Sequence, residues 1–226
     1  MDILNWLHIK KQQLIRTTLD SPKDLVILGA DVSFQKRGDK YQSYAMPAED
    51  FLAPVARPYK VYTALLTQTG TDDPLDQTSG TFTVGVSYRI GGYVAGDDFS
   101  NIGGPGVGVD GQWDGQWFVA TGTTPLNYTN GTLIQWNTGA PVVTVLENTI
   151  GNVWFTYDTD GLYYANSSGL FITDKITPFI GTQGVNILSS TCANTNLVEI
   201  LTYSVSIGNS ANDILYNTPI EIRVYN

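Results

Sequence analysis

The chain has 226 residues with only 15% charged side chains, 12% aromatic side chains and 23 glycines. Average soluble domains carry about 25% charged residues, so this composition is typical of an all-β protein with many tight turns. The single cysteine excludes an internal disulfide, and one histidine with one cysteine excludes a zinc site built from such residues. No apolar run approaches the roughly 18 residues of a membrane-spanning helix.

The charges divide the chain into two unequal parts. Residues 1–60 hold 9 of the 12 basic residues and 7 acidic residues, a net charge of +2, whereas residues 61–226 hold 3 basic and 14 acidic residues, a net charge of −11. An acidic body argues against nucleic acid as a partner, because phosphate binding needs clustered Lys and Arg. The mildly basic start suits docking on an acidic protein surface.

Residues 1–58 are predicted to form an N-terminal attachment arm that ends in a linker. Its first residues place apolar side chains near helical spacing, with lysines between them, so a short amphipathic helix and an extended arm both fit. A segment this short cannot bury Trp6 by itself, so we expect it to dock on another surface. The predicted attachment interface consists of Ile3, Leu4, Trp6, Leu7, Ile9, Lys10, Lys11 and Leu14.

Two stretches, 59–71 and 139–151, combine apolar β-branched sequence with a following turn. The second is interpreted as the continuation of the first, so that one strand is interrupted by an insertion at a loop tip, where extra residues cost little. We therefore predict an outer β-sandwich or jelly-roll domain formed by residues 59–71 and 139–226. Residues 72–138 are predicted to be an inserted Gly- and Trp-rich β module.

Short strands separated by turns dominate the rest of the sequence. Residues 81–88 alternate in the inserted module, and 91–115 is rich in glycine. After residue 151, short strands follow densely with Asp-Gly and Ser-Gly turns, and 220–225 is the cleanest alternation in the chain. Turns every 8 to 12 residues and little helical periodicity predict a mainly β fold of the sandwich or jelly-roll type.

Catalytic and metal-binding patterns are weak. The only histidine, His8, lies in the arm, so a Ser-His-Asp site needs the arm to fold onto the body. The DTDG sequence at 158–161 resembles the start of a calcium loop but lacks its later acids, and Asp-Gly between strands indicates a hairpin turn. We predict no catalytic residue, metal or cofactor. Four further acids are solvated or hold an ion at a loop tip: Asp97, Asp98, Asp110 and Asp114.

Three tryptophans of the inserted module, Trp113, Trp117 and Trp136, are candidates for glycan contact. Exposed aromatic rings stack on sugars, whereas buried ones pack in a core, and both interpretations stay open for these residues. A glycan hydrolase with paired acids is a further alternative, because such pairs are set by spatial separation rather than by a motif.

Several strings resemble modular fibre or appendage proteins of tailed bacteriophages, including crAss-like phages. The outer domain carries the resemblance in PYKVYTALLTQTGT, APVVTVLENTIGNVWFTY and NTPIEIRVYN. SYRIGGYVAGDDFSNIG and FVATGTTP are similar to a second module that recurs in phage structural proteins. The opening LNWLHIKK and DLVILGADVSFQKRGDKYQSYAM resemble attachment arms.

This resemblance implies a structural, non-enzymatic virion protein: a fibre or decoration protein on the phage head or tail. It implies docking on capsid or tail proteins through the arm, a homotrimer, and assembly in the cytoplasm of the bacterial host. The alternative is an adhesin module whose partners are host surface glycans. We expect neither nucleic acid nor a membrane as a partner.

Overall fold

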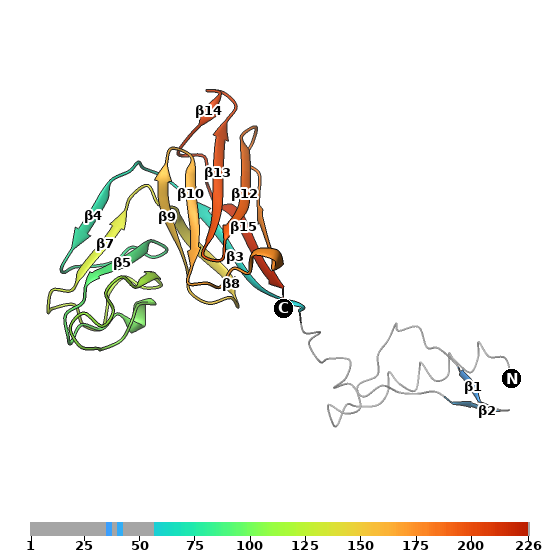
Figure 1. Ribbon diagram of the computed structural model, residues 1–226, viewed down its shortest axis with the longest axis horizontal. Helices are drawn as coiled ribbons and strands as arrows, with labels where there is room; N and C mark the ends of the chain where they lie inside the picture. The colour runs from blue at the N-terminus through green and yellow to red at the C-terminus, as the bar shows by residue number, and fades with distance from the viewer. Residues whose placement is uncertain (1–34, 38–39, 43–56, 226) are drawn as a thin grey trace, which may run out of the picture. The chain divides into compact units, whose positions relative to one another are not determined.

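The computed structural model describes residues 35–37, 40–42 and 57–225. The chain divides into two units, Met1–Ala56 and Arg57–Asn226. In the first unit, β1 (Gln35–Arg37) and β2 (Lys40–Gln42) form an antiparallel pair. The second unit contains three antiparallel sheets with thirteen strands (Figure 1), which confirms the predicted mainly β fold class.

Two of these sheets form a β-sandwich. Sheet 1 has the order β12-β13-β10-β9, with β14 paired to β13, and sheet 2 has the order β11-β15-β3-β8. The strands of sheet 1 are β9 (Val153–Thr159), β10 (Leu162–Ser167), β12 (Ile187–Asn194), β13 (Leu197–Ser204) and β14 (Asn209–Ser210). Those of sheet 2 are β3 (Tyr59–Thr67), β8 (Val142–Asn148), β11 (Ile176–Ile180) and β15 (Thr218–Tyr225).

Alternating side chains bury one face of each sheet in a shared core. In β15 the buried residues alternate with more exposed ones along the whole strand, because successive side chains point to opposite faces of a sheet. This first core joins residues from both sheets, and its fully buried aromatic side chains are Tyr62, Phe155, Tyr163 and Phe171. Burial on this scale is the main favourable contribution to folding of the sandwich.

The prediction of one interrupted strand is wrong in its topology. β8 does not continue β3 but lies beside it as its antiparallel neighbour, with Tyr62 opposite Asn148 and Thr67 opposite Val142. Both stretches have strand composition and a following turn, and these signals are identical for a continued strand and for two paired strands. The direction of the second strand comes from the path of the intervening residues, which a local pattern does not contain.

The third sheet lies within residues 74–137. Sheet 3 has the order β4-β7-β5-β6. Side chains from its strands and from the loops between them form a second core rich in aromatic residues, including Phe82, Tyr88, Phe99 and Phe118. Its strands are β4 (Pro74–Gln77), β5 (Ser87–Gly92), β6 (Trp117–Val119) and β7 (Leu133–Asn137). The short 3₁₀ helix η2 (Ser100–Ile102) also belongs to this segment, whereas η3 (Thr173–Lys175) leads into β11.

Sheet 3 is joined to the sandwich by main-chain and side-chain hydrogen bonds. The backbone N–H of Val143 donates to the carbonyl of Gly85 at 2.9 Å, and the N–H of Phe155 donates to Oγ of Ser87 at 2.8 Å. Val119 of β6 packs against the first core. These contacts hold β6 beside β9, where the candidate site lies. Within the described ranges, no helix is long and apolar enough to cross a membrane.

Candidate functional site: a tryptophan groove between β6 and β9

A pocket of about 440 Å³ lies where β6 of sheet 3 meets β9 of sheet 1. We call it the tryptophan groove. Sheet 3 contributes the residues just before and at the start of β6, and the sandwich contributes the start of β9, the end of β10 and the β12–β13 turn. The lining residues are Gly115, Gln116, Trp117, Asn152, Trp154, Ser167, Ser168 and Asn196.

Trp117 and Trp154 form the apolar centre of the groove. Their rings are nearly parallel, with an interplanar angle of 8° and ring centroids 6.1 Å apart. Aromatic pairs at this separation are offset rather than superimposed, so each indole leaves part of its face uncovered. Both side chains are half-buried, which keeps the rings rigid but accessible from solvent.

Strand alternation positions both tryptophans. In β6, Phe118 is buried in the second core, so Trp117 before it points to the opposite face of the sheet. In β9, Val153 and Phe155 are buried in the first core, so Trp154 between them points outward. Because Ser87 and Gly85 tie sheet 3 to the sandwich, the two outward-pointing indoles meet across the junction.

Polar side chains surround the indole pair and offer both donors and acceptors. Asn152 donates from Nδ2 to the carbonyl of Trp117 at 2.8 Å, which fixes its amide and leaves Oδ1 as an acceptor. Asn196 accepts the backbone N–H of Gly169 at Oδ1 at 2.7 Å, which leaves its Nδ2 as a donor. Gln116 and Ser168 add further polar groups to the rim.

None of the eight lining residues is charged, so the lining itself supplies no acid, base or ion pair. Arg89 is paired with Trp117 in the β5–β6 register and is the cation that lies beside the groove. Its Nη1 donates to Oε1 of Gln135 at 3.1 Å. The chemistry that this arrangement supports is reversible binding of a neutral ligand with one apolar face and several hydroxyl or amide groups.

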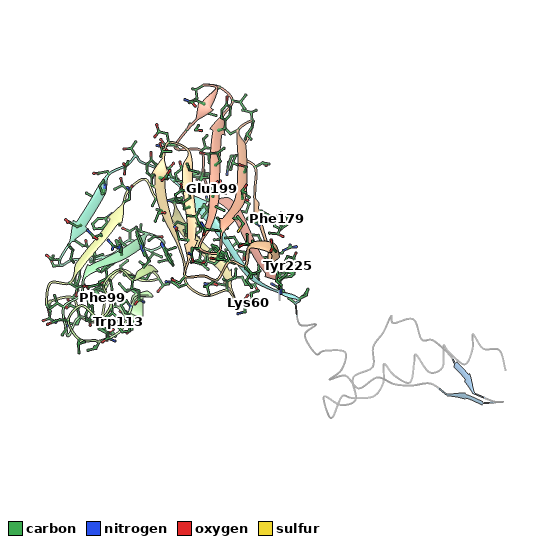
Figure 2. All side chains as sticks on the ribbon, in the orientation of Figure 1. Lys60, Phe99, Trp113, Phe179, Glu199 and Tyr225 are labelled. Atoms are coloured by element: carbon green, nitrogen blue, oxygen red, sulfur yellow. The ribbon has the colours of Figure 1, made fainter. Side chains whose placement is uncertain are left out.

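The structure separates the three tryptophans that were predicted together. Trp117 lies in the groove, whereas Trp113 and Trp136 pack against the second core. Trp113 donates from Nε1 to the carbonyl of Gly106 at 3.1 Å, and Trp136 packs on Tyr88 with ring centroids 5.5 Å apart. Figure 2 labels Trp113 and Phe99, a member of this second core, in the sheet 3 segment. Glycan contact stays a prediction for all three residues.

Sequence reasoning missed Trp154, the second ring of the pair. The stretch VWFTY opens the dense run of short strands predicted after residue 151, and alternation along a strand predicts that Trp154 and Phe155 point to opposite faces. That signal was sufficient to mark Trp154 as an outward-facing aromatic residue. Its pairing with Trp117 depends on the junction between the sheets, and no local pattern contains it.

The acidic residues singled out in the sequence serve as hydrogen-bond acceptors for nearby loops. Asp110 and Asp114 accept the backbone N–H groups of Ala95 and Tyr93 at 2.7 and 2.6 Å. Asp160 lies in the two-residue turn between β9 and β10 and accepts from Tyr157 and Asn212, as expected for a hairpin. In the part of the chain that the structure describes, no three His, Cys, Asp or Glu residues are grouped to hold a metal ion.

The predicted attachment interface, Ile3 to Leu14, lies outside the described residues. Comparison of the chain with protein families, with curated proteins and with solved structures found no match.

Proposed function

We propose that the β-rich body is a saccharide-binding module. The observation that carries this proposal is the offset pair of Trp117 and Trp154, set in an uncharged groove with amide side chains at its rim. Such pockets combine aromatic walls with a few polar groups that fix the orientation of the ligand.

The chemistry of a pyranose ring matches this groove. Its C–H groups form an apolar face that covers an indole, and its hydroxyls lie around the edge, where they reach side-chain amides. Oδ1 of Asn152 accepts a hydroxyl hydrogen and Nδ2 of Asn196 donates to a hydroxyl oxygen, so donors and acceptors are both present. The rigid indoles lose little conformational entropy when a sugar binds, which favours aromatic contacts over flexible ones.

Replacing Trp154 with alanine is expected to weaken saccharide binding at least about tenfold, a loss of about 1.4 kcal/mol of binding free energy. Removing half of the aromatic platform removes the contact with the apolar face of the sugar. A glycan array probed with the parent protein, Trp154→Ala and Trp117→Ala measures this effect. Tyr216→Ala is the matched control, because Tyr216 is an aromatic residue with 70% exposure that lies outside the groove.

Equal array signals from the parent and both tryptophan variants would place the binding elsewhere on the protein. No signal from the parent would remove the proposal. Circular dichroism of each variant separates a lost contact from a lost fold.

We also propose that this module works as part of a phage particle. In this view the protein is a fibre or decoration protein of the head or tail, forms a homotrimer, and docks by residues 1–58. Two observations support it: the resemblance of the quoted strings to phage appendage proteins, and the basic start of the chain, where residues 1–60 carry a net charge of +2 against −11 for the rest. A docking segment separate from a projecting acidic body suits such a role.

Removal of residues 1–50 is expected to leave a folded, soluble body that no longer joins phage particles. The body keeps its three sheets because their strands lie between residues 59 and 225. Quantitative mass spectrometry of purified particles measures incorporation, and analytical ultracentrifugation measures the oligomeric state. Normal copy number of the truncated protein in particles would contradict docking through the arm.

A further inference from the structure

The tryptophan groove opens onto the outward face of sheet 1. On this face Trp154 and Thr156 of β9 lie opposite Asn166 and Tyr164 of β10, respectively. The neighbouring residues Tyr163 and Ala165 are buried in the first core, so Tyr164 points outward on the same side as Trp154.

Tyr164 is the next aromatic residue after Trp154 along this face. The two are diagonal neighbours on paired strands, and such residues lie roughly 7 to 8 Å apart. A sugar stacked on Trp154 therefore leaves Tyr164 for the next sugar along a chain. Between them, Asn166 donates from Nδ2 to Oγ1 of Thr156 at 2.9 Å, which leaves the amide oxygen of Asn166 as an acceptor.

The charges of this face disfavour an anionic ligand. Two acidic residues of sheet 1, Asp158 of β9 and Glu199 of β13, lie beside Tyr164. Figure 2 shows Glu199 on this sheet. Burial, together with these two carboxylates, raises the pKa of the Tyr164 hydroxyl, so it stays a neutral donor at physiological pH. Between residues 57 and 225 the basic side chains all lie outside sheet 1: Arg57, Lys60, Arg89, Lys175 and Arg223.

We propose that the binding site continues from the tryptophan groove across the outward face of sheet 1 to Tyr164, and that its ligand is a neutral oligosaccharide rather than a single sugar. This inference rests on the proposed saccharide-binding function. It adds a second aromatic subsite and a charge selectivity to it, with Asn166 and Thr156 as the polar groups between the subsites.

The test is calorimetric titration of the full chain with neutral oligosaccharides of glucose and of N-acetylglucosamine, from the disaccharide to the hexasaccharide. The affinity of the parent is expected to rise with chain length. Tyr164→Ala is expected to bind the disaccharide as the parent does but to lose about five- to tenfold affinity for longer chains, because only these reach Tyr164. Trp154→Ala is expected to lose affinity at every length, and Tyr216→Ala at none.

Three outcomes overturn the inference in distinguishable ways. If the parent and Tyr164→Ala have the same affinity for every chain length, the site is confined to the groove and the proposed function stands. Tighter binding of galacturonic acid oligosaccharides, reduced by Arg89→Ala, would replace the neutral ligand with an acidic one. A parent that binds neither neutral series would remove the oligosaccharide assignment together with the function on which it rests.

Discussion

Asp97→Ala is expected to lower the free energy of unfolding by about 4 kcal/mol, since it leaves three backbone N–H groups, one buried and two partly buried, without their charged partner. Asp97 is fully buried. Its Oδ1 accepts the backbone N–H groups of Thr129 and Asn130, both at 2.9 Å, and its Oδ2 accepts that of Thr132 at 3.0 Å. One carboxylate thus holds residues 129–132, which precede β7, against the glycine-rich loop that follows β5, and the variant is expected to loosen both loops.

Chemical denaturation of the purified protein measures this loss. Asp98→Ala is the matched control, because Asp98 is the adjacent aspartate and is more exposed. Its carboxylate accepts from the backbone N–H and the hydroxyl of Ser100 alone among the described residues. We expect the control to cost about 1 kcal/mol or less. Equal costs for the two variants would show that the three hydrogen bonds accepted by Asp97 do not stabilise the fold.

The contribution of Asp97 also depends on pH. Burial alone would raise the pKa of its carboxyl group, but the N–H groups of Asn130, Thr132 and Thr129 and the hydroxyl of Thr132 stabilise the charged form and hold the pKa below its usual value. A group with a depressed folded-state pKa stabilises the fold above its unfolded pKa, about 3.9 for aspartate. This stabilisation is lost as the pH falls through the folded pKa, so the difference between the parent and Asp97→Ala should narrow below about pH 4.

Gly85→Ala is expected to cost about 3 to 5 kcal/mol and to disturb the tryptophan groove. Gly85 has a φ of +85°, a conformation that costs other residues roughly 1 to 2 kcal/mol. An added Cβ would also overlap the carbonyl oxygen of Val143. Gly85 links sheet 3 to the sandwich by accepting from Val143, so relief of the overlap moves the two apart. Thermal unfolding measures the stability, and near-ultraviolet circular dichroism reports on the Trp117–Trp154 pair.

Gly131→Ala is the control that separates the cost of the backbone conformation from the cost of the steric overlap of the added Cβ. Gly131 has a similar φ of +91°, but among the described residues no atom lies within 4 Å of the position of an added Cβ. This variant is therefore expected to lose only about 1 to 2 kcal/mol and to keep the signal of the indole pair. A Gly85→Ala protein as stable as Gly131→Ala would contradict the close approach of sheet 3 to the sandwich at this point.

Local patterns in the sequence predict the strands of this fold well and their arrangement less well. The alternation in β15 and the Asp160–Gly161 turn both correspond to the structure, because each depends on neighbours in the chain. The pairing of β3 with β8 was not predicted, because strand composition is the same whichever way a strand runs. Turn residues indicate where a strand ends but not which strand it joins.

The candidate site was predictable only in part, for the same reason. The sequence marks Trp117 as an aromatic residue of a turn-rich module, and the alternation around Trp154 marks it as outward-facing. Their meeting depends on hydrogen bonds between residues far apart in the chain, such as that between Phe155 and Ser87. By contrast, Trp113 and Trp136 have similar surroundings in the sequence but pack against the second core.

The most direct test of saccharide binding in the tryptophan groove is a nuclear magnetic resonance titration that follows the indole N–H signals. Each tryptophan gives one such signal, which single substitutions assign. On addition of the neutral oligosaccharide that binds most tightly, the signals of Trp117 and Trp154 are expected to shift together, and those of Trp113 and Trp136 to stay in place. Saturable binding that leaves the Trp117 and Trp154 signals unchanged would contradict the account.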